Sequence, residues 1–164
     1  MADTIFKIVN LKQFSARMKK KVRKLDKRGG PGGPYHMAVI YLDRWIQKNF
    51  DSDGKMAMGG SGWKPLAAST LRARAKGWGD YVKDSSPQIL RNRGTLKKSW
   101  KHNYNNRRAI IENYATAKGS TYYYGLAHDE GRGHLPERRI LPQEKQVSKK
   151  IKQIFGHWIR TSMK

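Results

Sequence analysis

The sequence predicts an α+β fold, in which a small antiparallel β-sheet packs with a basic N-terminal helix, an apolar second helix and a C-terminal amphipathic helix. Two observations predict this class. Apolar residues recur at helical spacing near both ends of the chain, and side chains alternate at strand spacing between Trp100 and Tyr104. A chain of 164 residues with 37% hydrophobic content can bury one core. We therefore expect residues 1–164 to form a single domain.

The basic N-terminal helix is predicted from Leu11 to Leu25, where apolar residues form one stripe and lysine and arginine cover the remaining circumference. A solvated face usually mixes both signs of charge, whereas Asp26 is the only acid near this one. Two interpretations stay open: a solvated face, or contact with DNA or an acidic partner. The candidates for that contact are Lys19, Lys20, Lys21, Arg23 and Lys24.

The apolar second helix is predicted from Tyr35 to about Phe50, with Pro34 in its first turn. Segments rich in glycine and polar residues flank this helix, and we expect mobile segments near 29–34 and 51–62. The glycines of the first segment resemble a phosphate-binding loop only in composition. Such a loop follows a strand and ends in Lys with Ser or Thr, and this one follows a helix and lacks both residues.

A β-hairpin is predicted in the middle of the chain. Gly94 allows the backbone to bend sharply from a turn into a strand that runs to Tyr104. Asn105 and Asn106 tolerate left-handed backbone angles, and we expect them to form a two-residue turn into a second strand at 109–112.

Two short helices are predicted on either side of this hairpin. The first runs from Ser69 to Lys76, with Ser69 or an earlier residue near its cap. The second runs from Tyr122 to Glu130 and is closed by Gly131 and Gly133.

The C-terminal helix is predicted to begin at Pro142, a favourable first-turn residue. A basic amphipathic helix can bind a membrane surface, but we favour docking onto the protein's own sheet. The sequence has neither a run of eighteen apolar residues nor the apolar core of a signal peptide, so we expect no membrane partner. The predicted apolar face consists of Val147, Ile151, Ile154, Phe155, Trp158 and Ile159.

The composition restricts the chemistry of the chain. It has no cysteine, which excludes disulfides and Cys-ligated zinc, and its net charge of +23 favours a polyanion or an acidic protein as partner. The densest group of metal-binding residue types contains His128, Asp129, Glu130 and His134. The two histidines are six residues apart and would face different sides of a helix. We expect no metal, no cofactor and no enzymatic activity.

Four short motifs follow one another between Trp63 and Leu141. They contain Trp63, Pro65 and Leu66; then Leu90, Gly94, Leu96 and Ser99; then Tyr124, His128 and Gly131; and finally Pro136, Arg139 and Leu141. In this order they resemble the phage virion-morphogenesis or tail-completion family, which includes Mu-like protein G and, more distantly, proteins similar to lambda minor tail protein Z. The sequence differs at Asp129, where a Gln is common, and at Glu137, where a small residue is common.

The resemblance implies a structural virion protein, a neck subunit that acts in tail completion or head-tail joining. Such subunits form homo-oligomeric rings, often sixfold, around the DNA channel. The implied partners are phage DNA and other neck and tail proteins, namely the connector and the tail terminator or tube. The implied location is the head-tail junction of the virion, after assembly in the host cytoplasm. We interpret the motif residues as structural, with none of them catalytic.

Two other functions stay open from the sequence. The first is a stand-alone nucleic-acid-binding protein that recognises the backbone without sequence preference, through basic faces and exposed aromatic residues. A weaker candidate is a nuclease or toxin with the group at 128–134 at its centre.

Overall fold

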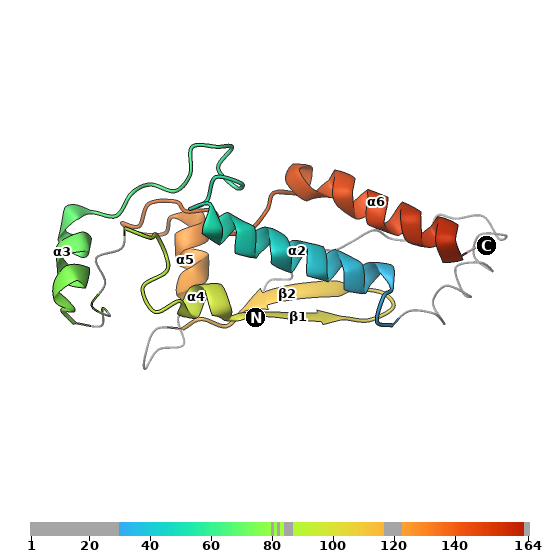
Figure 1. Ribbon diagram of the computed structural model, residues 1–164, viewed down its shortest axis with the longest axis horizontal. Helices are drawn as coiled ribbons and strands as arrows, with labels where there is room; N and C mark the ends of the chain where they lie inside the picture. Colours follow the sequence, from blue (N-terminus) through green and yellow to red (C-terminus); the bar gives the residue numbers. More distant parts are fainter. Residues whose placement is uncertain (1–29, 80, 82, 84–86, 117–122, 163–164) are drawn as a thin grey trace. The chain divides into compact units, whose positions relative to one another are not determined.

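The structure, a computed structural model, describes residues 30–79, 81, 83, 87–116 and 123–162. Within these ranges it contains five helices and a two-stranded sheet, which confirms the predicted α+β class (Figure 1). No helix of the described ranges is both long and apolar enough to span a bilayer. The predicted basic N-terminal helix lies outside the described residues, and so do its candidate contact residues Lys19, Lys20, Lys21, Arg23 and Lys24.

The elements follow one another as α2 (Pro34–Asp51), α3 (Ala68–Lys76), α4 (Thr95–Lys98), β1 (Trp100–Tyr104), β2 (Ala109–Asn113), α5 (Tyr124–Glu130) and α6 (Glu144–Ser162). Contacts between residues group the chain into two compact units. The first unit comprises residues 1–44, 102–112 and 144–164, and the second comprises residues 45–101 and 113–143. The expectation of a single domain stays a prediction.

Aromatic contacts join the elements of the first unit. The ring of Tyr35 in α2 meets Phe155 of α6 edge to face, with centroids 5.1 Å apart. The ring of His36 lies 4.6 Å from that of Tyr104 in β1. From the sequence we expect α6 to dock on the sheet, whereas the aromatic contact described for α6 is with α2.

The predicted start of the C-terminal helix is wrong by two residues, because α6 begins at Glu144 and not at Pro142. The residue before Pro142 is bound to another segment, since the N–H of Leu141 donates to the carboxylate of Asp129. The apolar spacing is nevertheless that of a helix, and α6 buries Val147 and the residue one turn later, Ile151.

The hairpin turn lies one residue later than predicted. The backbone N–H of Asn105 donates to the carbonyl oxygen of Arg108, which leaves Asn106 and Arg107 in the loop. The side-chain oxygen of Asn105 accepts hydrogen bonds from the N–H groups of Arg107 and Arg108, at 2.8 and 3.0 Å. Asn105 thus stabilises the turn through its side chain rather than through left-handed backbone angles, and this shifts the register.

A buried asparagine fixes the core of the second unit. Asn49 in α2 is fully buried, and its side-chain N–H groups donate to the carbonyl oxygens of Arg139 and Ile140 at 3.0 and 3.2 Å. Its side-chain oxygen accepts a hydrogen bond of 3.0 Å from the N–H of Ala57. Two of these bonds join α2 to the segment at 139–140, and the third joins α2 to the turns that follow it. Asn49 therefore connects two separate segments to the helix.

The segment near 51–62 folds into hydrogen-bonded turns. The N–H of Gly54 donates to the carbonyl oxygen of Asn49 at 2.8 Å, and the N–H of Trp63 donates to that of Asp53 at 2.7 Å. A side chain at Gly54 would meet the Trp63 ring at 2.3 Å, so the turn needs glycine there. The mobility of this segment and of the one near 29–34 stays a prediction.

The strand expected directly after Gly94 begins later than the sequence indicates. Gly94 has a positive φ of 70°, which confirms the need for glycine, but it precedes the one-turn helix α4, which contains Leu96. The helix α3 begins one residue before Ser69, and Ala67 precedes it without a side-chain cap. The helix α5 ends at Gly131 in a left-handed conformation, as predicted.

Candidate functional site

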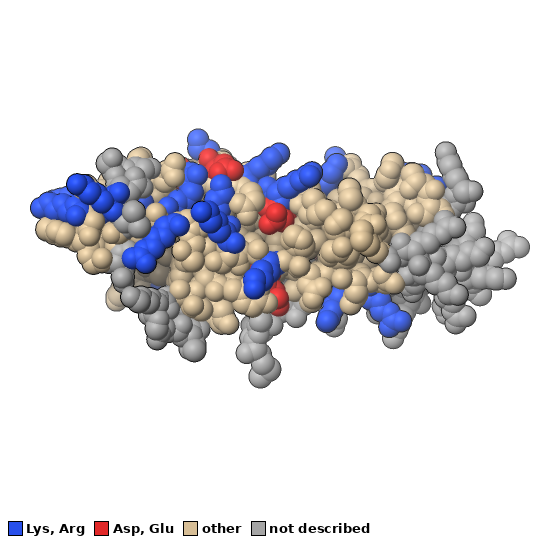
Figure 2. All heavy atoms as spheres, turned by 60° about the horizontal axis from the view of Figure 1, so that its bottom comes forward, with Lys and Arg blue, Asp and Glu red and all other residues tan. Residues whose placement is uncertain are grey.

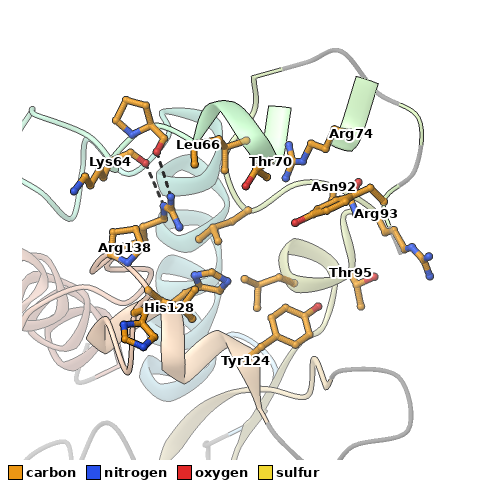
Figure 3. A pocket seen from close by; sticks show the side chains of 18 of the residues that line it. Lys64, Leu66, Thr70, Arg74, Asn92, Arg93, Thr95, Tyr124, His128 and Arg138 are labelled. Carbon is orange, nitrogen blue, oxygen red and sulfur yellow. Dashed lines mark hydrogen bonds between the residues drawn. The ribbon is translucent and has the colours of Figure 1, made fainter. Parts of the chain in front are cut away.

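A groove of about 1010 Å³ lies within the second unit, bordered by α3, α4, α5 and the segments at 64–67, 90–94 and 133–138 (Figure 3). It brings together residues of all four motifs that the sequence analysis singled out. The motif residues that line it are Pro65, Leu66, Leu90, Gly94, Leu96, Tyr124, His128 and Pro136.

The other motif residues do not line the groove but hold its walls. Trp63 donates from its indole Nε1 to the carbonyl oxygen of Arg139 at 2.8 Å. The hydroxyl of Ser99, which follows α4, donates to the carbonyl oxygen of Thr95. A side chain at Gly131 would lie 2.8 Å from the backbone nitrogen of Glu137, so this position requires glycine. The last member, Leu141, is bound through its N–H to Asp129.

Two residues one helical turn apart on α5, Tyr124 and His128, both face the groove, as their spacing predicts (Figure 3). Burial raises the pKa of Tyr124, and its hydrogen bond with Thr95 of α4 opposes that shift. Burial and, to a smaller extent, the charge of Arg138 lower the pKa of His128 to about 4. His128 is therefore a neutral imidazole at pH 7, and its buried Nδ1 has no hydrogen-bond partner among the described residues.

Two arginines that the sequence analysis did not single out also line the groove. Arg74 and Arg138 are only 4% and 5% exposed. Arg138 donates from Nε to the carbonyl oxygen of Lys64 at 3.2 Å and from a terminal nitrogen to that of Pro65 at 3.4 Å (Figure 3). Arg74 donates to the carbonyl oxygen of Gln88 at 2.7 Å, while its buried Nε has no partner within the described part of the chain.

The carboxylates near His128 have structural roles. Asp129 accepts hydrogen bonds from the N–H groups of Ile140 and Leu141 at 2.6 and 3.0 Å. Burial raises the pKa of Asp129, and these two hydrogen bonds and the charge of Arg139 oppose the shift. Arg139 forms an ion pair with Glu137, at 2.5 Å.

The predicted group at 128–134 does not converge on one point. Glu130 pairs with Arg132 at 2.5 Å, whereas the two histidines line the groove and Asp129 binds backbone. Among the described residues, no three His, Asp or Glu side chains are placed to hold a metal ion.

Basic side chains also exceed acidic ones on the face of the protein that Figure 2 shows. Figure 2 shows one face on which Lys and Arg side chains are widespread and Asp and Glu are few, in line with 35 basic and 12 acidic residues in the whole chain. The cations are scattered over this face rather than gathered into one stripe (Figure 2).

A scan against protein-family models, a search of curated proteins and a search of solved structures each gave no significant match to this chain.

Proposed function

We propose that this protein is a structural virion subunit of a tailed bacteriophage, a neck protein that acts in tail completion or head-tail joining. The observation that supports the proposal most is the convergence of the four motifs in the second unit. The first and last motifs are joined directly, since Trp63 donates to the carbonyl oxygen of Arg139 and Arg138 donates to those of Lys64 and Pro65. Four motifs that form one substructure together indicate the family more specifically than four short matches at unrelated places would.

The charge supports a place next to a polyanion. In the proposed assembly the subunits form a homo-oligomeric ring around the DNA channel, which is a hexamer if the ring is sixfold. Six chains of net charge +23 repel one another unless DNA or acidic neighbouring rings offset the charge. The partners in this proposal are phage DNA, the connector, and the tail terminator or tube.

The proposed role is structural rather than enzymatic. General acid-base or metal-assisted chemistry needs carboxylates and histidines that converge on a substrate. The acids beside His128 are engaged instead by backbone N–H groups and arginines. In this proposal the groove is therefore a binding surface.

Deletion of the gene from a phage that carries it tests the proposal. We expect DNA-filled heads and complete tails that stay separate, or that join without infectivity, and rescue when the wild-type gene is supplied in trans. Electron microscopy of the lysates and a plaque assay provide the readout. Normal infectious particles from the deletion, with the protein bound along DNA in the cell, would overturn the proposal in favour of a stand-alone nucleic-acid-binding protein.

A further inference from the structure

The charged side chains among the described residues that line the groove of the second unit are all basic. They are Lys64, Arg74, Arg93 and Arg138, and no Asp or Glu occurs among the described lining residues. A concave site with one sign of charge concentrates the electrostatic potential inside it. The charge pattern of this groove therefore favours an anionic occupant.

No described carboxylate lines the groove beside its two buried guanidinium groups. Arg74 and Arg138 line the same groove. Burial, followed by the charge of Arg74, lowers the pKa of Arg138. Their described hydrogen bonds go to backbone carbonyl oxygens, and the Nε of Arg74 has none. A buried charge is costly unless a counter-ion and hydrogen bonds compensate it. A carboxylate placed between them would supply both.

Apolar side chains also line the groove, and they favour a protein carboxylate over the phosphates of DNA as its occupant. Leu66, Leu90, Leu96 and Pro136 line it together with Leu135, which is 39% exposed. Duplex DNA presents its phosphates on a polar backbone and is bound by exposed basic side chains. Two buried arginines in a groove that leucines also line fit a carboxylate on a flexible side chain, flanked by apolar residues that cover the leucines.

We infer that this groove binds an acidic segment of another protein, in which an Asp or Glu side chain reaches Arg74 and Arg138 and neighbouring apolar residues contact the leucines of the wall. The identity of that protein as an adjacent neck or tail component rests on the proposed function, whereas the binding chemistry does not. Figure 3 shows the two arginines entering from different elements, Arg74 from α3 and Arg138 from the segment after α5.

Selection of a displayed library of random heptapeptides on the full-length protein, with excess duplex DNA present, tests the inference. We expect the enriched peptides to carry Asp or Glu within two positions of a large apolar residue. A labelled synthetic copy of the most enriched peptide is then titrated by fluorescence anisotropy. Arg74→Gln and Arg138→Gln should each weaken its binding by about tenfold or more, because each removes a charge-assisted hydrogen bond.

The matched control is Lys98→Gln, which removes one exposed charge outside the groove and should leave peptide binding unchanged. Replacing the acid of the peptide by its amide should weaken binding as much as the arginine variants do. If either arginine variant fails to fold, amide chemical shifts of the wild-type protein replace it. Peptide should then shift the signals of Thr70, Thr95 and His128, which line the groove.

Three results would overturn the inference: enrichment without the acidic and apolar pattern, equal weakening by Lys98→Gln, or displacement of the peptide from the groove by duplex DNA. The last would make the groove a nucleic-acid site. Failure here is distinguishable from failure of the proposed function. If heads and tails stay separate in the deletion but the protein binds no acidic peptide, this inference alone is overturned. If the deletion gives infectious particles but the protein binds acidic peptides, the neck assignment alone is overturned.

Discussion

The indole Nε1 of Trp63 donates a hydrogen bond of 2.8 Å to the carbonyl oxygen of Arg139, across 76 residues of sequence. The same oxygen accepts a second hydrogen bond, of 3.0 Å, from the side chain of Asn49. One carbonyl thus connects α2, the turns that follow it and the last motif. This junction holds the segment that carries Arg138 at the wall of the groove.

Loss of the indole donor should destabilise the second unit measurably. Trp63→Phe keeps a ring against Phe50, which lies 5.4 Å away between centroids, but removes the N–H. We expect the free energy of unfolding to fall by about 1–2 kcal/mol, measured by urea unfolding. The control Trp78→Phe changes a side chain that is 59% exposed, and should cost less than about 0.5 kcal/mol. Equal losses in the two variants would contradict a specific role for this hydrogen bond.

Substitution of Asn49 should lower the free energy of unfolding more than substitution of Trp63 does. Asn49→Leu removes three hydrogen bonds in a buried site. The carbonyl oxygen of Arg139 keeps its bond from Trp63 and the N–H of Ala57 keeps its bond to Gly54, whereas the carbonyl oxygen of Ile140 loses its side-chain donor. Each lost hydrogen bond costs about 1 kcal/mol and a buried group left unsatisfied costs about 1–3 kcal/mol, so we expect a loss of several kcal/mol or failure to fold. Asn103→Leu, at an exposed position of β1, is the control and should fold. A stable Asn49→Leu variant would show that these bonds contribute little.

Protonation of His128 should lower the free energy of unfolding as the pH decreases. Its pKa is about 4 in the folded protein and 6.5 in the unfolded chain, so the unfolded chain binds its proton at higher pH. The contribution of neutral His128 is fully present above about pH 6.5 and is lost as the pH falls toward 4. Unfolding free energies measured across this window should fall less steeply in His128→Gln, and His134→Gln is the control from the same groove. An unchanged slope in His128→Gln would refute the assignment.

The close approach after α5 can be tested with two glycines of similar backbone conformation. Gly131 and Gly133 have φ of 67° and 65°. A Cβ atom at Gly131 would lie 2.8 Å from the backbone nitrogen of Glu137, whereas a Cβ atom at Gly133 would have no described atom within 4 Å. Gly133→Ala should cost about 1 kcal/mol, from backbone strain alone. Gly131→Ala should cost more, because the backbone of the last motif must move. Thermal unfolding compares the two, and equal shifts would argue against the contact.

Much of the fold could be predicted because its signals are local. The apolar spacing of α2 and α6, the alternation in β1 and the glycine after α5 each report on a few neighbouring residues. The one-turn helix α4 could not be found in this way, since four residues are too short for a helical period. The turn register depended on the side chain of Asn105, which binds two N–H groups that spacing does not reveal.

The site was predicted less completely than the fold. The motif residues Leu90, Tyr124 and His128 were named from the sequence and line the groove. Its two buried arginines were missed because Arg74 and Arg138 are far apart in sequence and occur among many other basic residues. A signal existed for Arg138, which lies two residues after the motif proline, but Arg74 has no local feature that distinguishes it.

The most direct test of the central claim is a reconstruction by electron microscopy of the head-tail junction of an intact phage that encodes this protein, combined with mass spectrometry of the purified particles. The account predicts several copies per particle, arranged as a ring around the DNA channel between connector and tail. Particles that are infectious and contain no copy of the protein, with no density at the junction that fits its helices α2 and α6, would contradict it.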